Sequence, residues 1–438
     1  MSAVTIERRP IRFAGHPARS GPLTWAQRHM WEQRIWMLPN DTFVNETQGV
    51  PVPPGTSLET VLIALESLLS RYEALRTLFP DETTQQVRAE GEVEVEIVRV
   101  GGSVAPDELQ RLAGEQEQRL LQTPFDPATQ LSFRAVIGVV AGEPRVVLLG
   151  LSHLTADLLS CRLLIAELGG LLSGRTPAAQ PVRHPIDQAE HEASPAGEKT
   201  ARKAIAYWAG ELAAGDPAMF TAPPIEPATP RYWRGALRSR AAAAALPILA
   251  ARHRSSTATV LLTGIATVLG ERTGRDRCVL RLVAGNRFTP ELRAAVGNLT
   301  QEIVASIDLR AADFGQRMKA TWSATMRAYR HGSYPPEPVR ELIAATPHGI
   351  DCCVNDLFTP MQGAAAPDPV HLGERGEFAW ERRTEKAGVR FFLEAFDERA
   401  DPSIVRLSLL ADTAHLPPDQ VEATLRELEA LLVGLAHD

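Results

Sequence analysis

The segment SHLTADL, residues 152–158, follows directly on the apolar run VVLLGL, residues 146–151. The run predicts a strand that is buried on both faces, because it is short and apolar at successive positions. The segment therefore places a histidine where this strand ends. Successive side chains of a strand point to opposite faces, so we expect Ser152 and His153 to point apart rather than to form a nucleophile–base pair. The second glycine of a serine-hydrolase elbow is also missing, which disfavours that class of enzyme.

Asp157 precedes a stretch with helical spacing, in which the apolar residues are Cys161, Leu164, Ile165, Leu168, Leu171 and Leu172. One interpretation of Asp157 is therefore a helix N-cap, which stabilises a helix by about 1 kcal/mol. His153 has two interpretations. It is either a hydrogen-bonded histidine at a strand end, or a base that takes a proton from an amine or alcohol, since its ordinary pKa is near 6.5.

Composition excludes several classes of function. The 438 residues include 46 basic and 53 acidic ones, a formal net charge of -7, which gives no reason to expect nucleic acid or a membrane surface as partner. The first residues lack the apolar core of a secretion signal, and no apolar run reaches the length of a membrane span. The four cysteines lack CxxC spacing, and there is no P-loop, GxGxxG or HExxH motif. We therefore expect no bound metal or nucleotide, and a reduced, cytoplasmic setting.

The chain is long enough for two or three domains. The order of predicted helices and strands is mixed, which favours the α+β class over a regular βαβ array. We predict an N-terminal lobe over 1–175, a linker or surface crossing over 176–200, and a C-terminal lobe over 201–438. The expected helices are 58–71, 201–212, 257–272 and 418–435. The expected strands are 93–100, a hairpin over 133–151, 277–283, 302–309 and 352–358.

Four separate parts of the chain carry a common pattern. They are PLTWAQRHMW at 22–31, RYEALRTLF at 71–79, SHLTADL at 152–158, and GNRF at 285–288 followed by VGNLTQ at 296–301. In this order and at these spacings they resemble the elements of the condensation-domain superfamily of nonribosomal peptide synthesis. The third element resembles that family's HHxxxDG motif. The second is the most specific match.

The resemblance implies two lobes of the chloramphenicol acetyltransferase type, arranged as a V around a central tunnel. It makes His153 the catalytic residue and Asp157 a structural acid, which pairs with an arginine for which Arg287 is the candidate. The other interpretation of Arg287 is a solvated arginine in a turn. The resemblance implies no bound cofactor, because the substrates arrive on the phosphopantetheine arms of an acyl or peptidyl carrier protein.

Two motif positions depart from the family. Ser152 replaces the first motif histidine, on the face expected to point away from the tunnel. Leu158 replaces the motif glycine, and its side chain would fill space that glycine leaves open. Asn355 and Asp356 interrupt an apolar run and are candidates to line the tunnel, or else form a turn at the strand end.

We therefore expect a free-standing condensation-type acyltransferase for natural-product biosynthesis, such as that of an antibiotic. It would join a carrier-bound acyl or aminoacyl thioester to an amine or hydroxyl acceptor. One alternative is a catalytically silent scaffold that binds a carrier protein or recruits a tailoring enzyme. Another is an acyltransferase that uses acyl-CoA.

Overall fold

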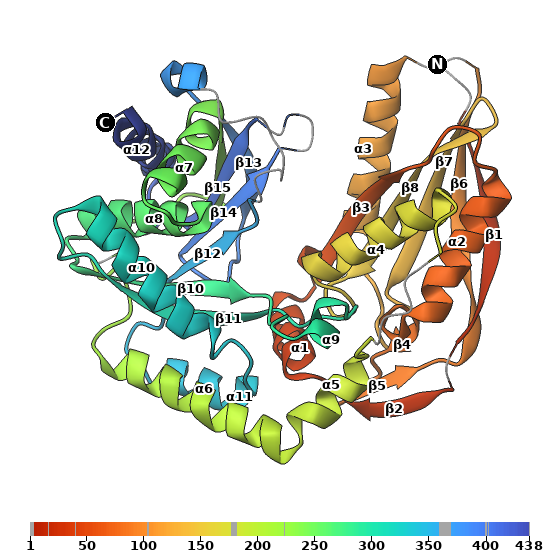
Figure 1. Ribbon diagram of the computed structural model, residues 1–438, viewed down its shortest axis with the longest axis horizontal. Helices are drawn as coiled ribbons and strands as arrows, with labels where there is room; N and C mark the ends of the chain where they lie inside the picture. Colours follow the sequence, from red (N-terminus) through yellow and green to blue (C-terminus); the bar gives the residue numbers. More distant parts are fainter. Residues whose placement is uncertain are drawn as a thin grey trace. The chain divides into compact units, whose positions relative to one another are not determined.

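The computed structural model describes residues 4–15, 17–39, 41–102, 105–176, 182–222, 224–358, 369–398, 401 and 403–437. The chain forms two compact units (Figure 1). Unit 1 combines Met1–Ala201 with Gly285–Gln301, and unit 2 combines Arg202–Ala284 with Glu302–Asp438. Each unit contains helices and a mainly antiparallel or mixed sheet, which confirms the α+β class.

The division differs from the predicted lobes in one segment. The predicted C-terminal lobe, 201–438, includes Gly285–Gln301, whereas these residues pack with unit 1. The predicted linker, 176–200, also contains regular structure, because helix α5 (Pro185–Glu192) and the first turns of helix α6 (Pro195–Ala213) lie there. Alanine, proline and charged residues obscure the apolar period of α5 and of the first turns of α6, so the sequence pattern missed α5 and started α6 late, at residue 201.

Unit 1 is built on a five-stranded sheet of order β1-β6-β7-β8-β3. Its strands are β1 (Val4–Ala14), β6 (Glu90–Val100), β7 (Phe133–Val140), β8 (Glu143–Ser152) and β3 (Asn45–Pro51). Strands β6 and β7 are parallel and the other neighbours are antiparallel. The predicted hairpin is thus β7–β8, and β8 is an inner strand between β7 and β3. An inner position explains why β8 is apolar on both faces.

Helices cover both faces of this sheet. Helices α2 (Leu58–Arg71) and α4 (Leu158–Leu172) share one core with strands β1, β6, β7 and β8. On the other face, helix α3 (Pro106–Gln122) contributes Leu120 to a small cluster with Val98, Val136 and Leu148. The bounds of α2 agree with the predicted helix 58–71, because its leucines recur at helical spacing and Ser57 caps its N-terminus.

A second, smaller sheet completes unit 1. Its order is β2-β5-β4, formed by Arg19–Pro22, Thr84–Val87 and Thr77–Leu78. Beside these strands the unit contains helix α1 (Trp25–Met37), the 3-10 helices η1 (Asp41–Val44) and η2 (Glu73–Arg76), and the short helix α9 (Pro290–Arg293).

Unit 2 contains a seven-stranded sheet of order β11-β10-β12-β14-β15-β9-β13. The strands are β11 (Gln301–Asp308), β10 (Arg277–Ala284), β12 (Cys352–Asp356), β14 (Phe391–Asp397), β15 (Val405–Asp412), β9 (Tyr232–Ser239) and β13 (Glu377–Thr384). The helices are α6, α7 (Arg240–Arg252), α8 (Thr257–Thr273), α10 (Phe314–Tyr329), α11 (Pro336–Ala344) and α12 (Pro418–His437), with the 3-10 helix η3 (Pro369–Gly373).

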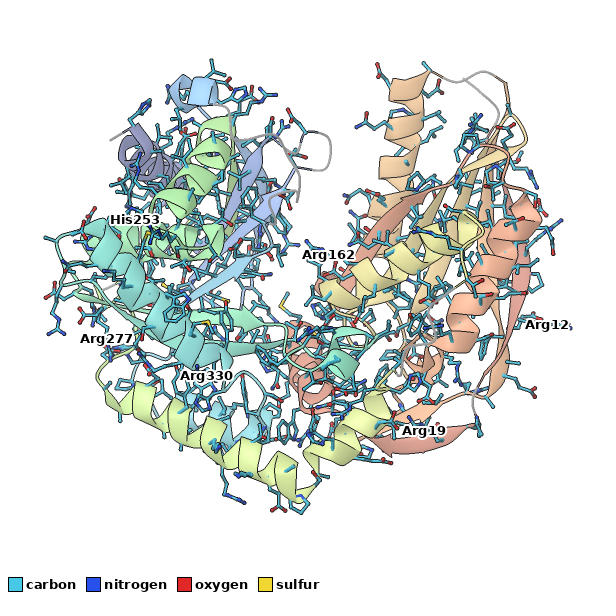
Figure 2. The ribbon with its side chains drawn as sticks, in the orientation of Figure 1. Arg12, Arg19, Arg162, His253, Arg277 and Arg330 are labelled. Atoms are coloured by element: carbon cyan, nitrogen blue, oxygen red, sulfur yellow. The ribbon has the colours of Figure 1, made fainter. Side chains whose placement is uncertain are left out.

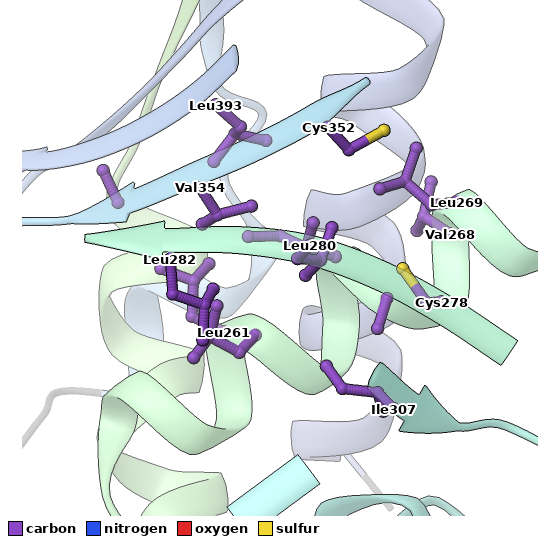
Figure 3. Close-up of a cluster of buried hydrophobic side chains, with 14 of the residues drawn as sticks. Leu261, Val268, Leu269, Cys278, Leu280, Leu282, Ile307, Cys352, Val354 and Leu393 are labelled. Atoms are coloured by element: carbon purple, nitrogen blue, oxygen red, sulfur yellow. The ribbon is translucent and has the colours of Figure 1, made fainter. Parts of the chain in front are cut away.

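The core of unit 2 forms where helix α8 packs against the sheet (Figure 3). Leu261 and Leu269 from α8 lie with Leu280 from β10 and Val354 from β12. The predicted helices and strands of this unit are present, with shifts of a few residues at their ends. The strand predicted over 352–358 ends at Asp356, because the Asp356 carboxylate accepts the backbone N–H of Phe358 at 3.1 Å and turns the chain.

Candidate functional site in unit 1

The candidate site lies where strand β8 gives way to helix α4. Ser152 is the last residue of β8, His153 begins the turn that follows, and Asp157 caps α4 by accepting the N–H of Ser160 at 2.9 Å. The helix therefore begins at Leu158, directly after the acid. Because an aspartate satisfies the free N–H groups of a first helical turn, the sequence fixes the end of this loop locally.

The Asp157 carboxylate binds Arg287 in a bidentate pair, with both N–O distances at 2.7 Å. Only 1% of the Asp157 side chain and 7% of the Arg287 side chain are exposed. The structure thus places these two residues in direct contact, 130 positions apart in sequence, and Arg287 is not a solvated turn residue. Two parallel N–H···O bonds also fix the orientation of both groups, as a single point contact would not.

Three further groups hold the same carboxylate. Besides Ser160, the N–H of Leu299 donates to it at 3.0 Å and the hydroxyl of Thr300 donates at 3.1 Å. Burial by itself raises the pKa of Asp157, but the charge and hydrogen bonds of Arg287, with the two N–H donors, outweigh it, so the pKa lies below its ordinary value. The carboxylate is therefore ionised and has donors on both oxygens.

Ser160 joins the helix to the returning segment. Its hydroxyl donates to the carbonyl of Gly297 at 2.7 Å and accepts from Arg287 at 2.8 Å, and the N–H of Gly297 approaches it at 3.0 Å. The amide of Asn286 adds a bond to the carbonyl of Leu299 at 2.9 Å. Sequence reasoning did not single out Ser160 or Thr300. Ser160 could have been found because it lies three residues after Asp157, the acid that caps α4. Thr300 lies within the motif VGNLTQ at 296–301.

His153 is held through its backbone, since its N–H donates to the carbonyl of Val44 in η1 at 2.6 Å. The residue is half-buried. Its Nδ1 atom is buried and has no hydrogen-bond partner among the described residues. An imidazole held on a fixed backbone has the chemistry of a general base.

The remaining candidates fall into two groups. Ser152 is buried, with 2% of its surface exposed, and Leu158 is half-buried in the first turn of α4. Asn355 and Asp356 belong to unit 2, at the end of β12, and are half-buried. Burial, assisted by the charge of Asp397 and opposed by the N–H of Phe358, raises the pKa of Asp356 to about 6.

The other quoted motifs form supports of unit 1. In the first, Thr24 and Gln27 form a capping box at the start of α1, with bonds of 3.1 and 2.9 Å. In the second, Glu73 is buried and accepts two bonds from Arg19, at 3.0 and 2.8 Å, while the fully buried Arg76 donates to the carbonyl of Arg88. Arg19 lies on β2, where Figure 2 labels it. These motifs therefore hold the framework that surrounds the loop.

Other classes of site find no support in the described part of the chain. No group of three or more His, Cys, Asp or Glu residues there is arranged to hold a metal ion. The four cysteines are buried free thiols, and burial raises the pKa of each of them, so they are poor nucleophiles. No described helix is long and apolar enough to cross a membrane.

The fold consists of two α+β units, and comparisons with known proteins give the family. The sequence profile of the condensation domain matches residues 18–361. The chain therefore belongs to the condensation-domain family. The activity class of that family is condensation-type acyl transfer in nonribosomal peptide and polyketide synthesis.

Three similar proteins illustrate the range of the family. Malpinin synthetase of Mortierella alpina is 27% identical over 347 residues, covering 74% of this chain and 4% of that synthetase. The condensation domain that mediates chain release from the enacyloxin polyketide synthase aligns with a TM-score of 0.74 at 20% identity, covering 96% of this chain and 83% of the other. The X-domain solved in complex with OxyB from teicoplanin biosynthesis aligns with a TM-score of 0.67 at 18% identity, covering 97% of this chain and 95% of the other. This chain thus spans a small fraction of the curated synthetase that it matches.

Proposed function

We propose that this protein is a condensation-type acyltransferase that joins a carrier-bound acyl or aminoacyl thioester to an amine or hydroxyl acceptor. One observation carries the proposal. The buried pair of Asp157 and Arg287 fixes the loop that holds a half-exposed His153 at the end of β8. Positioning together with a single base is sufficient for this type of reaction.

In the proposed reaction, the acceptor nitrogen or oxygen attacks the thioester carbonyl carbon. A C–N or C–O bond forms and the C–S bond breaks. His153 takes the proton of the nucleophile and returns it to the departing thiolate of the phosphopantetheine arm. No metal or organic cofactor takes part in this scheme. A cytoplasmic setting is part of the proposal.

We further propose that donor and acceptor arrive in trans, so that the protein acts as a free-standing enzyme in natural-product biosynthesis. An acyl or peptidyl carrier protein is then its partner. Its relatives belong to peptide and polyketide synthesis systems, which supports a carrier protein as the partner. A small soluble thioester such as acyl-CoA is the other donor to compare in the same assay.

The test is a product assay with loaded carrier proteins and candidate acceptors, run on the native protein, His153→Ala and His253→Ala. His253 is an exposed histidine at the end of α7 (Figure 2) and serves as the matched control. Loss of a general base lowers rates about 10²–10⁴-fold. We expect such a loss in kcat/KM for His153→Ala and none for His253→Ala. Equal turnover of all three proteins would remove His153 from the mechanism.

The second candidate function is a silent scaffold that binds a carrier protein or recruits a tailoring enzyme. Leu158 favours it, because this half-buried side chain stands where the family motif has glycine. The similar X-domain was solved in complex with OxyB. Carrier binding that His153→Ala leaves unchanged, combined with no product from any donor and acceptor, would select the scaffold over the enzyme.

A further inference from the structure

Strands β6 and β7 of unit 1 pair over only part of their length. Their parallel ladder begins at Glu96 beside Val136, whereas β6 itself begins at Glu90. Strand β1 pairs with the whole of β6, and β8 pairs with β7 from Phe133 onward. The five-stranded sheet is therefore split at this end, between the pair β1–β6 and the three strands β7, β8 and β3.

The register with β1 shows which backbone groups of β6 face this split. The N–H of Gly15, the residue after β1, donates to the carbonyl of Ala89, the residue before β6, at 2.9 Å. These two residues therefore form a hydrogen-bonded pair, and such pairs alternate with non-hydrogen-bonded ones along an antiparallel ladder. Glu90, Glu92 and Glu94 are non-hydrogen-bonded positions, so their N–H and C=O groups point away from β1 and into the split. We name these three residues the acidic edge.

Two residues of β1 agree with this register. Arg12 lies beside Glu92 and donates its N–H to the carboxylate of Glu66 at 3.2 Å rather than to β6. Pro10 lies beside Glu94 and has no N–H to donate. The backbone groups of the acidic edge make no hydrogen bond to other described residues. They therefore form an open strand edge inside the sheet.

A cavity of about 680 Å³ lies at the split. Residues Glu90–Glu94 of β6 line it on one side, and Phe133–Val136 of β7 line it on the other. Phe13, Leu78 and Leu131 contribute to the same lining. Because both strands line one cavity, side chains do not fill the space between them, and the open edge is accessible to another chain.

The side chains of the acidic edge form a row on one face of β6, because they are two residues apart in a strand. All three are exposed. Among the described residues only Glu92 of the three has an ion pair, with Arg12 at 3.4 Å, and 85% of the Arg12 side chain is exposed. Such an exposed pair contributes little energy and is easily exchanged.

Four arginines also line the cavity. Arg8 and Arg119 both bind Glu96, where the ladder with β7 begins. Arg134 donates to two backbone carbonyls that follow α3, at 2.7 and 2.8 Å, and the fourth arginine is the exposed Arg88. Three of the four therefore already have partners, so the acidic edge is the part of the cavity that can accept a positive charge.

We propose that this split binds an extended segment of a partner protein, which adds as a strand to the acidic edge. In strand addition, main-chain hydrogen bonds give affinity and alternate side chains give specificity. Opposite charges directly across two strands attract, so the segment carries lysine or arginine beside the three glutamates. Its intervening residues are apolar, because the other face presents Phe13 and Phe133 of the main core of unit 1. The inference does not depend on the proposed acyl transfer.

The test is a calorimetric titration of the whole protein with a blocked heptapeptide of alternating lysine and valine. The same peptide with glutamate in place of lysine is the charge control. A fully N-methylated form, which has no N–H donor, is the backbone control. We expect the lysine peptide to bind at least tenfold more tightly than either control, because only it supplies both the charges and the donors.

Hydrogen exchange locates the bound peptide. At a peptide concentration ten times Kd, exchange should slow about tenfold at the amides of Glu90, Glu92 and Glu94. The amides of Gly91 and Val93 already donate to β1 and should change little. Protection of Gly91 and Val93 without protection of the acidic edge would overturn the proposal.

The double variant Glu90→Gln with Glu94→Gln removes two of the charges. It should weaken binding of the lysine peptide about twofold to thirtyfold, since each cross-strand charge pair contributes about 0.2–1 kcal/mol. Glu82→Gln is the matched control, because Glu82 is exposed before β5 and does not line the cavity, and it should bind as the native protein does.

Three results of these experiments would refute the proposal. The first is equal binding of the lysine and glutamate peptides, and the second is no binding of the lysine peptide. The third is protection of the acidic edge that grows with protein concentration when no peptide is present. That result would show that a second copy of this chain occupies the split instead of a basic segment of a partner.

Discussion

Removal of Arg287 isolates a buried charge, and its consequence follows from the contacts of Asp157. The Arg287→Ala change deletes two bonds of 2.7 Å to a carboxylate that is only 1% exposed. It also deletes the bond to Ser160. Breaking one partner of a buried ion pair costs about 3–5 kcal/mol. The remaining donors from Ser160, Leu299 and Thr300 compensate part of this, so we expect a loss of about 3 kcal/mol in the free energy of unfolding of unit 1.

The same change reverses a pH dependence. In the native protein the pKa of Asp157 is lowered, so its contribution to stability is present above the ordinary pKa of about 3.9 and is lost as pH falls through the lowered value. Without Arg287, burial dominates and the pKa of Asp157 rises above its ordinary value. The contribution of Asp157 to the stability of the variant is then greatest at low pH and is lost as pH rises through the raised pKa. The variant should therefore lose less stability than the native protein on acidification.

The assay is unfolding in urea followed by peptide-resolved hydrogen exchange, which reports unit 1 separately. Arg12→Ala is the control, since Arg12 is an arginine of the same unit with 85% of its side chain exposed (Figure 2). We expect that control within about 0.5 kcal/mol of the native protein. The double variant Asp157→Asn with Arg287→Met removes both charges and should recover part of the loss. A loss below about 1 kcal/mol for Arg287→Ala, or strictly additive effects in the double variant, would refute this account of the pair.

Three further predictions concern unit 1. Burial raises the pKa of Glu192 to about 7, although the hydrogen bonds from Gln188 and from the N–H of Trp25 lower it. The contribution of Glu192 to stability is therefore present at pH values below its ordinary pKa of about 4.3, and it is lost as pH rises through about 7. Glu192→Gln should abolish this loss, of up to about 3 kcal/mol, in unfolding measured from about pH 5 to 8; an unchanged pH profile would contradict it. Thr24→Ala breaks the capping box of α1 and should cost about 1 kcal/mol in thermal unfolding, and a neutral result would show that the cap is redundant. Leu158→Gly restores the motif glycine and should raise kcat/KM several-fold, while it lowers the free energy of unfolding by about 1 kcal/mol. An unchanged or lower kcat/KM would show that Leu158 does not block the site.

Local signals account for what the sequence predicted correctly. The bounds of α2 follow from leucines at helical spacing behind a serine cap. The end of β8 at Ser152 follows from an apolar run that stops at a polar residue, and the start of α4 follows from Asp157 as its cap. Each of these features depends on residues within one or two turns of each other, so periodicity and capping chemistry suffice to find them.

Contacts between distant segments account for what the sequence could not decide. The return of Gly285–Gln301 to unit 1 brings Arg287, Leu299 and Thr300 onto Asp157, and no periodic signal marks a contact across some 130 residues. The family resemblance pointed to Arg287, but only the folded chain showed its burial.

The sequence by itself determined the α+β class, the strand that delivers His153 and the acid that ends its loop. The tertiary structure decided which groups satisfy that acid. The physical reason is that hydrogen bonds to buried charges are set by whichever segments the packing brings together. The support of the loop that carries His153 therefore depends on the folded chain, and the seven residues 152–158 do not determine it by themselves.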